Sequence, residues 1–218
     1  CPRPSLPAPR SRGESESAME TIKLVIDGKQ VETERGTTLL GAARKAGVDI
    51  PTLCHDDRLA PYGACRLCLV EIEKNGRKRL VASCAYLAED GLTVRTETEK
   101  IRKLRRMILE LLLAESSTGP LESLAKKYGL EESRFEIERP KCILCGLCVR
   151  YCAEVKKKNV TCFIGRGIDK EVVFLSDFSN SECPMCRECL PLCPSGTLYS
   201  LYLKGFSGKP ETPPKKNI

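Results

Sequence analysis

The chain has 218 residues, with 14 cysteines, six tyrosines, five phenylalanines, no tryptophan and a formal net charge of +7. Its longest apolar run, residues 107–114, is interrupted by Glu110 and falls far short of the roughly 20 residues of a membrane span, and no apolar stretch near the start is typical of a secretory signal. We therefore expect neither a membrane-spanning protein nor a disulfide-stapled secreted module, and we expect the thiols to stay reduced in the cytoplasm.

Residues 1–18 are rich in Pro, Ser and Arg and have almost no apolar content, so they cannot bury a core. We predict a disordered leader, an expression remnant or an over-long reading frame rather than a transit peptide. Cys1 lies within this leader and is expected to have no part in the chemistry.

A regular pattern begins at Met19 and predicts a first domain over residues 19–97. Alternating apolar residues predict a β-hairpin over residues 22–33, and the Asp-Gly pair at 27–28 predicts its turn. A short helix over residues 39–46 follows, capped by one of the two threonines that precede it and ended by a glycine.

After a cysteine-bearing loop, the first domain is predicted to return to strands. Cys68–Glu73 and Leu80–Cys84 flank an Asn-Gly turn at 75–76 and read as a second hairpin. Residues 92–95 are predicted to add one more strand.

A helical linker is predicted over residues 98–138. Its first helix runs from Glu97 to Glu115 with apolar residues at helical spacing. A second helix is predicted from Pro120, a residue suited to the first helical position, to Tyr128. The apolar face of the first helix is expected to comprise Ile101, Leu104, Met107, Ile108, Leu111 and Leu112. The basic residues assigned to a solvated face, rather than to a docking site, are Lys100, Arg102, Lys103, Arg105 and Arg106.

A third domain is predicted over residues 139–203, followed by a flexible tail over residues 204–218 that contains Gly, Pro and Lys. The domain contains an internal repeat, because the pattern C-x2-C-x2-C-x3-C occurs twice, the second copy 41 residues after the first. The two runs are Cys142, Cys145, Cys148 and Cys152, and Cys183, Cys186, Cys189 and Cys193.

Each of these runs places three thiolates around one face of a cuboidal cluster, while its fourth cysteine reaches the other cluster. We therefore expect the two runs to interlock around two [4Fe-4S] clusters. Free buried thiols or zinc are the alternatives, but they leave the duplicate register of eight cysteines unexplained. The predicted ligand sets are Cys142, Cys145, Cys148 and Cys193 for one cluster, and Cys183, Cys186, Cys189 and Cys152 for the other.

Four more cysteines lie in the first domain, separated by ten, two and fifteen residues. A long loop, a tight C-x2-C and a distant fourth cysteine resemble the plant-type pattern for a [2Fe-2S] cluster, with a longer first gap. We predict a [2Fe-2S] cluster; zinc is the alternative, although these spacings are looser than those of usual zinc sites. Gly63 and Ala64 leave room for backbone N–H groups near the sulfurs. The predicted ligands are Cys54, Cys65, Cys68 and Cys84.

Two further residues of metal-ligand type are assigned no ligand role. His55 is the only histidine, and a Rieske centre needs two, so we expect it to be a hydrogen-bonding neighbour of the site. Cys162 falls outside every quartet and is expected to be a buried small hydrophobe.

The positive net charge alone would suggest nucleic acid or an acidic membrane surface as a partner. However, twelve cysteinate ligands around three oxidised cluster cores carry a total charge of about −6, which would leave the loaded protein at about +1. No nucleic-acid partner is therefore expected.

Several segments between residues 20 and 200 resemble the iron-sulfur subunit, or small diaphorase subunit, of NAD-linked hydrogenases and formate dehydrogenases. They also resemble the N-terminal part of the large iron-sulfur subunit of respiratory complex I and of [FeFe] hydrogenases. This resemblance implies an α+β protein with a β-grasp [2Fe-2S] ferredoxin domain, a helical linker and a two-cluster [4Fe-4S] ferredoxin domain. The segments are CHDDRLAPYGACRLCLVEIE, RLVASC, IRKLRRMILELLLAE, CILCGLCVRYC, FIGRGID and CPMCRECLPLCPSG.

The linker departs from this resemblance. The relatives commonly carry a further cluster site there, made of one His and three Cys, yet residues 85–141 contain neither residue type. We therefore expect three clusters with about ten iron atoms per chain. The 120–128 helix is expected to fill the space of the missing cluster by packing Leu121, Leu124 and Ala125.

No phosphate-cradling motif, nucleophile and base pair, or molybdenum or hydrogen-activating signature is present, and Gly165-Arg166-Gly167 is too short for a dinucleotide fingerprint. We predict no catalytic residues and an electron-transfer subunit of a cytoplasmic, hetero-oligomeric NAD(P)-linked oxidoreductase. Its expected partners are a flavin/NAD(P)-binding subunit and a hydrogenase, formate dehydrogenase or bifurcating catalytic subunit. The alternatives are a free multicluster ferredoxin that diffuses as a carrier, and a fumarate reductase iron-sulfur subunit, whose first cysteine gap is shorter.

Overall fold

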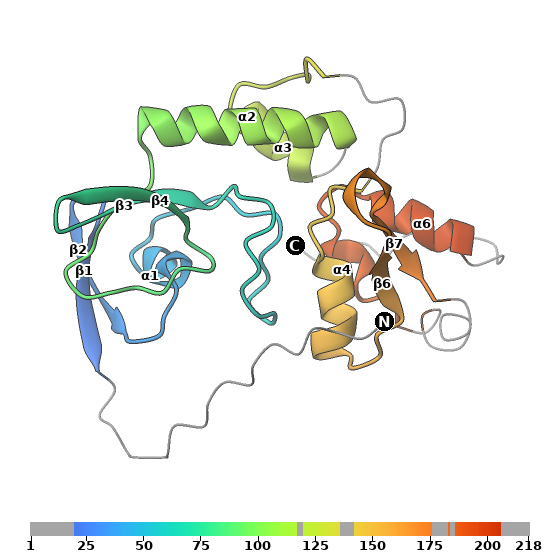
Figure 1. The fold of residues 1–218 in the computed structure, drawn as a ribbon, viewed down its shortest axis with the longest axis horizontal. Helices are drawn as coiled ribbons and strands as arrows, with labels where there is room; N and C mark the ends of the chain where they lie inside the picture. Colours follow the sequence, from blue (N-terminus) through green and yellow to red (C-terminus); the bar gives the residue numbers. More distant parts are fainter. Residues whose placement is uncertain (1–19, 117–119, 136–141, 176–182, 184–185, 206–218) are drawn as a thin grey trace.

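The computed structural model describes residues 20–116, 120–135, 142–175, 183 and 186–205. In this part of the chain, a five-stranded sheet lies at one end and a group of short helices with a two-stranded sheet at the other, and two helices pack along them (Figure 1). The predicted leader and Cys1 lie outside the described residues. Within the described ranges, every helix is too short or too polar to cross a bilayer.

The five-stranded sheet is mixed, with the strand order β2-β1-β5-β3-β4. Only β1 and β5 pair in parallel; the other neighbours are antiparallel. Both predicted hairpins are confirmed, because Asp-Gly at 27–28 and Asn-Gly at 75–76 have positive φ at both positions, as two-residue hairpin turns require. The strands are β1 (Thr21–Ile26), β2 (Lys29–Glu34), β3 (Leu69–Lys74), β4 (Arg77–Ala82) and β5 (Thr93–Arg95).

One helix, α1 (Leu39–Lys45), forms where it was predicted and packs on this sheet. The Thr38 hydroxyl accepts a hydrogen bond from Gly41 N at 3.2 Å and so caps the helix. Its buried residues share one core with the inward-facing residues of the strands. A mixed sheet that covers one short helix is consistent with the expected β-grasp fold, whereas the two-cluster ferredoxin domain stays a prediction.

Two helices follow the sheet, α2 (Glu99–Glu115) and α3 (Pro120–Lys127). Both were predicted, but the exposed and buried faces of α2 differ from expectation. Arg105, assigned to the solvated face, is fully buried, whereas Met107 and Leu111, assigned to the apolar face, are 53% and 50% exposed. The correction has a physical reason: the buried stripe of α2 passes through position 105, where the guanidinium finds buried hydrogen-bond partners. This stripe consists of Ile101, Arg105, Leu109 and Leu113.

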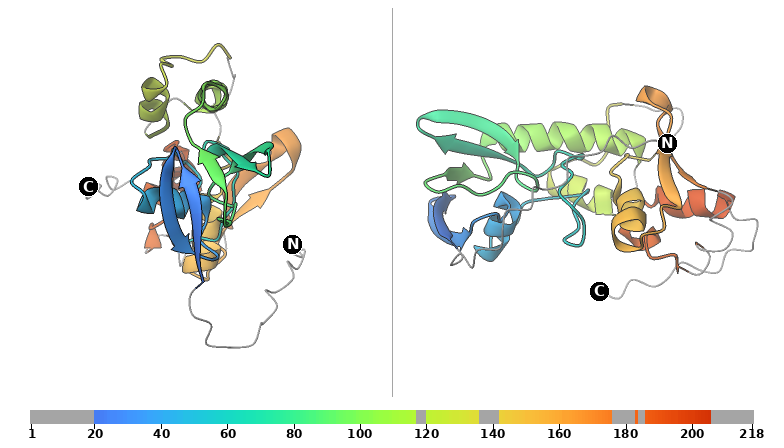
Figure 2. Two further views of the ribbon diagram at one scale, coloured as in Figure 1. Left: turned by 90° about the vertical axis from the view of Figure 1, so that its left-hand side faces the viewer. Right: turned by 60° about the horizontal axis from the view of Figure 1, so that its bottom comes forward.

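The other end of the molecule is built from short elements around the cysteine runs, and Figure 2 shows α2 running along the sheet toward it. None of these elements was predicted from the sequence, and α6 continues two residues into the predicted tail. They are α4 (Leu147–Arg150), a π-helical turn η1 (Tyr151–Val155), β6 (Thr161–Ile164), η2 (Gly167–Asp169), β7 (Glu171–Phe174), η3 (Leu190–Leu192) and α6 (Thr197–Gly205). Strands β6 and β7 form an antiparallel hairpin.

Candidate metal-cluster sites

The four cysteines of the first domain come together at the edge of the five-stranded sheet. Each is buried and none forms a disulfide. The Cys65 backbone N–H donates to Cys54 Sγ at 3.3 Å, and the sulfurs of Cys68 and Cys84 are also 3.3 Å apart. The pKa of Cys84 is raised by its hydrogen bond with Cys68, by burial and by negative charge on the other three thiols. All four sulfur atoms therefore occupy one small region.

The thiols of this site form two hydrogen-bonded pairs. Hydrogen bonding from Cys65 lowers the pKa of Cys54 to about 6 against the effect of burial, and the positive charge of Arg150 also lowers it. Hydrogen bonding with Cys84 likewise lowers the pKa of Cys68 to about 6. Within each pair, a hydrogen bond stabilises a thiolate, which suits a site that binds metal through thiolates.

Backbone N–H groups surround the sulfurs, as predicted from the small residues before Cys65. Hydrogen bonds from the backbone of Ala64 and Cys65 lower the pKa of Cys54. The pKa of Cys65 is raised by its hydrogen bond with Cys54 and by burial, and backbone bonds from Leu67 and Leu53 oppose this rise. N–H donors of this kind stabilise negative charge on cluster sulfurs and tune reduction potentials.

A charged side chain from α2 holds the loop around Cys68. Arg105 donates from Nε to the Leu67 carbonyl at 3.0 Å and from a terminal nitrogen to the Leu69 carbonyl at 2.9 Å. Its remaining nitrogen bonds the Glu97 carboxylate and the Tyr128 hydroxyl. Sequence reasoning missed this residue because its charge is typical of a solvated face.

In the third domain, the first cysteine run lies close to the last cysteine of the second run. Burial raises the pKa of Cys145 to about 12, and negative charge on Cys142 and Cys193 adds to the effect. The pKa of Cys148 is also raised, first by burial and then by charge on thiols that include these. The structure thus brings together the four residues of one predicted ligand set. The ligation itself stays a prediction.

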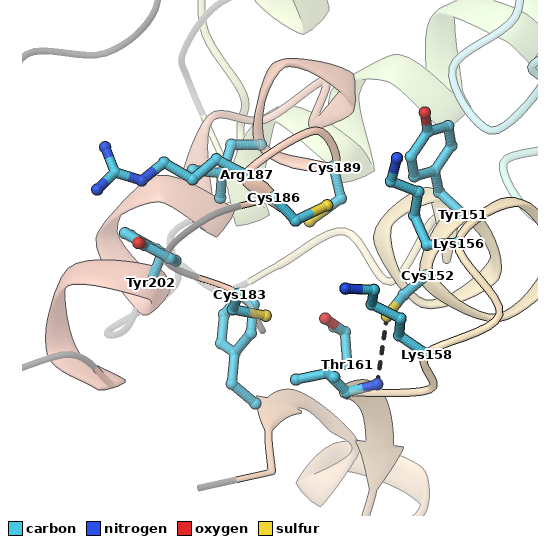
Figure 3. Close-up of a pocket in the computed structure, with 13 residues that line it drawn as sticks. Tyr151, Cys152, Lys156, Lys158, Thr161, Cys183, Cys186, Arg187, Cys189 and Tyr202 are labelled. Atoms are coloured by element: carbon cyan, nitrogen blue, oxygen red, sulfur yellow. Dashed lines mark hydrogen bonds between the residues drawn. The ribbon is translucent and has the colours of Figure 1, made fainter. Parts of the chain in front are cut away.

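The second predicted set surrounds a hollow of about 410 Å³ that is partly open to solvent. Figure 3 shows Cys152, Cys183, Cys186 and Cys189 around it. Burial raises the pKa of Cys189 to about 12, with a further contribution from charge on the other three thiols. The Val160 backbone N–H donates to Cys152 Sγ at 3.2 Å, and basic side chains also line the hollow.

Known proteins are similar to this chain both in the first domain and over most of its length. A family model described as a 2Fe-2S iron-sulfur cluster binding domain matches residues 19–99. An NADH-quinone oxidoreductase subunit of Rhizobium meliloti is 35% identical over 82% of this chain and 24% of that protein. NADP-reducing hydrogenase subunit HndD of Solidesulfovibrio fructosivorans is 31% identical over 83% of this chain and 36% of that protein. The chain thus spans about a quarter to a third of the curated relatives it matches.

A solved structure extends the likeness to the fold. A chain in the crystal structure of an NAD+-reducing [NiFe]-hydrogenase in the H2-reduced state superposes with a TM-score of 0.70 at 31% identity. The match covers 80% of this chain and 85% of that chain. This chain belongs to the iron-sulfur subunit family of NAD-linked hydrogenases and NADH-quinone oxidoreductases. The family confirms the resemblance drawn from the cysteine-bearing segments.

In this member of the iron-sulfur subunit family, the linker helices pack against residues of two candidate sites. Leu121 and Ala125 of α3 are fully buried, and Leu124 is partly buried. They belong to one apolar cluster that also contains Cys54 and Cys145. The predicted packing of these three residues is therefore confirmed, whereas the replacement of a cluster by this helix stays a prediction.

The two residues that were assigned no ligand role have the following surroundings. His55 Nε2 lies 2.9 Å from Asp57 Oδ1 and is therefore engaged in a hydrogen bond. Cys162 lies on β6 and is half-buried, not fully buried as predicted, because it sits on a two-stranded hairpin near the surface. Among the described residues, no group of three or more His, Cys, Asp or Glu side chains is arranged to hold a single metal ion.

Proposed function

We propose that this chain is an electron-transfer subunit of an NAD(P)-linked oxidoreductase. It relays electrons between a flavin/NAD(P)-binding subunit and a catalytic partner, which is a hydrogenase, a formate dehydrogenase or a bifurcating oxidoreductase. Its carriers are one [2Fe-2S] cluster at Cys54, Cys65, Cys68 and Cys84, and two [4Fe-4S] clusters at Cys142, Cys145, Cys148 and Cys193 and at Cys183, Cys186, Cys189 and Cys152.

The observation that carries this proposal is the apolar cluster shared by the first two candidate sites. Cys54 and Cys65 of the first domain and Cys145 of the third are buried in the same cluster. Burial raises the pKa of Cys145, and negative charge on Cys54 raises it further. Carriers held at these positions would therefore be neighbours, with apolar side chains packed around both.

The donor sets fit iron-sulfur groups. Each set consists of thiols alone, without a disulfide, backbone N–H groups bond sulfurs in all three, and the third set surrounds a hollow. Iron-sulfur clusters supply one-electron carriers. The chain's own residues hold the ligand loops, exclude water and place N–H donors and basic groups near negative sulfur, so no general acid or base is needed.

The names of the relatives support the proposed partner subunits. Their names describe subunits of NADH-quinone oxidoreductase, NADPH-Fe(3+) oxidoreductase and NADP-reducing hydrogenase. Anaerobic affinity purification of the full chain from its own cells tests the proposal. A flavoprotein in stoichiometric amount is the expected result, whereas a lone monomer would favour the diffusible ferredoxin.

A further inference from the structure

Arg150 connects the two halves of the molecule at the backbone of a proposed cluster ligand. It ends α4, two residues after Cys148 and two before Cys152. One terminal nitrogen donates to the Cys54 carbonyl oxygen at 3.2 Å, and the other donates to the carbonyl of Ala60. The side chain is only 11% exposed, so its charge lies mostly out of water.

The loop that receives Arg150 is held from both sides. The guanidinium carbon lies 4.8 Å from the centre of the Tyr62 ring, a cation–π distance. Glu154, one helical turn after Arg150, accepts a hydrogen bond from the Ala60 backbone N–H at 2.8 Å. The segment that follows Cys54 is therefore bonded through both its carbonyl and its N–H groups to the half that carries the [4Fe-4S] candidates.

The charges around Arg150 are arranged asymmetrically. The two terminal nitrogens face the Cys54 loop, while Glu154 lies 3.4 Å from Nε and is 36% exposed. Water screens the exposed carboxylate more than the buried guanidinium. Of these two charges, the guanidinium therefore contributes more at Cys54, and its contribution favours negative charge there.

We propose that Arg150 is a positioning residue that fixes the Cys54 loop against the second half and raises the reduction potential of the [2Fe-2S] group. Reduction adds one negative charge to the group, and a nearby positive charge stabilises that state. The inference rests on the proposed function, since it assumes that Cys54 is a ligand of that cluster. One side chain would then contribute both to the contact between the two halves and to the potential of the first carrier.

The test is an EPR-monitored redox titration of the full-length, anaerobically reconstituted protein, in which the [2Fe-2S] signal is followed separately from the [4Fe-4S] signals. Arg150→Gln should shift the [2Fe-2S] midpoint potential to a lower value. Arg150→Lys keeps the charge and should stay close to the unmodified protein. The matched control is Arg58→Gln, which removes an arginine from the same interface.

Arg58 suits this comparison because it stacks on Tyr151 at 4.8 Å and pairs with Asp56, without contacting a cysteine backbone. Arg58→Gln should therefore shift the midpoint potential by clearly less than Arg150→Gln. An equal shift in both variants, or no shift in Arg150→Gln, would overturn the inference.

Glu154→Gln provides a test of opposite sign that does not need the Arg150 variant to fold. The amide oxygen can still accept from Ala60 N, but the negative charge is gone, so the [2Fe-2S] midpoint should rise. A fall or an unchanged value would contradict the inference. Failure of the proposed function is distinguishable, because it is tested by other observations. The subunit role fails if no flavoprotein co-purifies with the chain, and the ligand assignment fails if the unmodified protein lacks a [2Fe-2S] signal.

Discussion

The Nε atom of Arg105 lies 3.0 Å from the carbonyl oxygen of Leu67, the residue before a proposed cluster ligand. A helix outside the five-stranded sheet therefore holds the loop that carries Cys68. The side chain is fully buried, and its hydrogen bonds replace the water that the two carbonyl groups would otherwise bind.

Replacing Arg105 by Met should destabilise the protein, because the Leu67 and Leu69 carbonyls would lose their donors inside the fold. Buried groups left without partners cost about 1–3 kcal/mol each, so we expect the two carbonyls to cost about 2–6 kcal/mol in total. In a chain of this size that lowers Tm by about 4–24 °C. Thermal unfolding of the anaerobically reconstituted protein measures this change in Tm.

The neighbouring exposed Arg106 provides the control. Arg106→Met should change the stability by no more than about 0.5 kcal/mol, as is usual for surface substitutions. Equal Tm values for the two variants would mean that the buried guanidinium contributes nothing to holding the loop.

The hairpin of β6 and β7 should be sensitive to a methyl group at Gly165. This glycine has φ of 66°, and a Cβ atom there would lie 2.2 Å from the Asp169 carbonyl oxygen. Gly165→Ala should therefore destabilise the hairpin by at least about 2 kcal/mol. Faster amide hydrogen exchange over residues 161–174 would report it.

Gly167 offers a matched position, with φ of 59° and open space around a built Cβ. Gly167→Ala should destabilise the hairpin only through the left-handed backbone conformation, by about 1 kcal/mol, because the added methyl group meets no other atom. Exchange should be faster in the Gly165 variant than in the Gly167 variant, and the reverse order would refute this account of the turn.

The cysteine sets predict separable losses of spectroscopic signals. Cys65→Ser should remove the [2Fe-2S] signal and leave the [4Fe-4S] signals, and Cys152→Ser should damage the cluster held by the second run. Cys162→Ser, outside every set, should leave all signals in place. If Cys152→Ser abolished only the cluster of the first run, the crossed ligation would be wrong.

The reconstituted chain alone should not oxidise NADH or take up hydrogen. This follows from a sequence without a dinucleotide fingerprint or a catalytic-metal signature. Anaerobic assays with NADH and an artificial electron acceptor check it, with the purified flavoprotein partner added afterwards as the positive control. Turnover by the chain alone would contradict the proposed role.

Local signals in the sequence were sufficient for much of the first half. The two hairpins follow from dipeptides whose residues accept positive φ, and the cap of α1 follows from a threonine before an apolar run. The cysteine spacings led to the proposed sets because ligand types and short gaps are visible without a fold.

Tertiary partners explain what the sequence did not reveal. Arg105 bonds carbonyls 36 and 38 residues earlier, and Arg150 bonds one 96 residues earlier. No local pattern distinguishes such arginines from solvated ones. The four-residue strands β6 and β7 were missed for a related reason, since segments this short depend on each other and on packing for stability.

The central claim is that one [2Fe-2S] and two [4Fe-4S] clusters occupy this chain and that none lies in the linker. Anaerobic iron and acid-labile sulfide analysis of the fully reconstituted chain tests it most directly. We predict about ten iron atoms and about ten sulfides per chain. About fourteen of each, with a third [4Fe-4S] signal, would contradict the claim, because the chain would then contain a ligand set beyond the twelve cysteines.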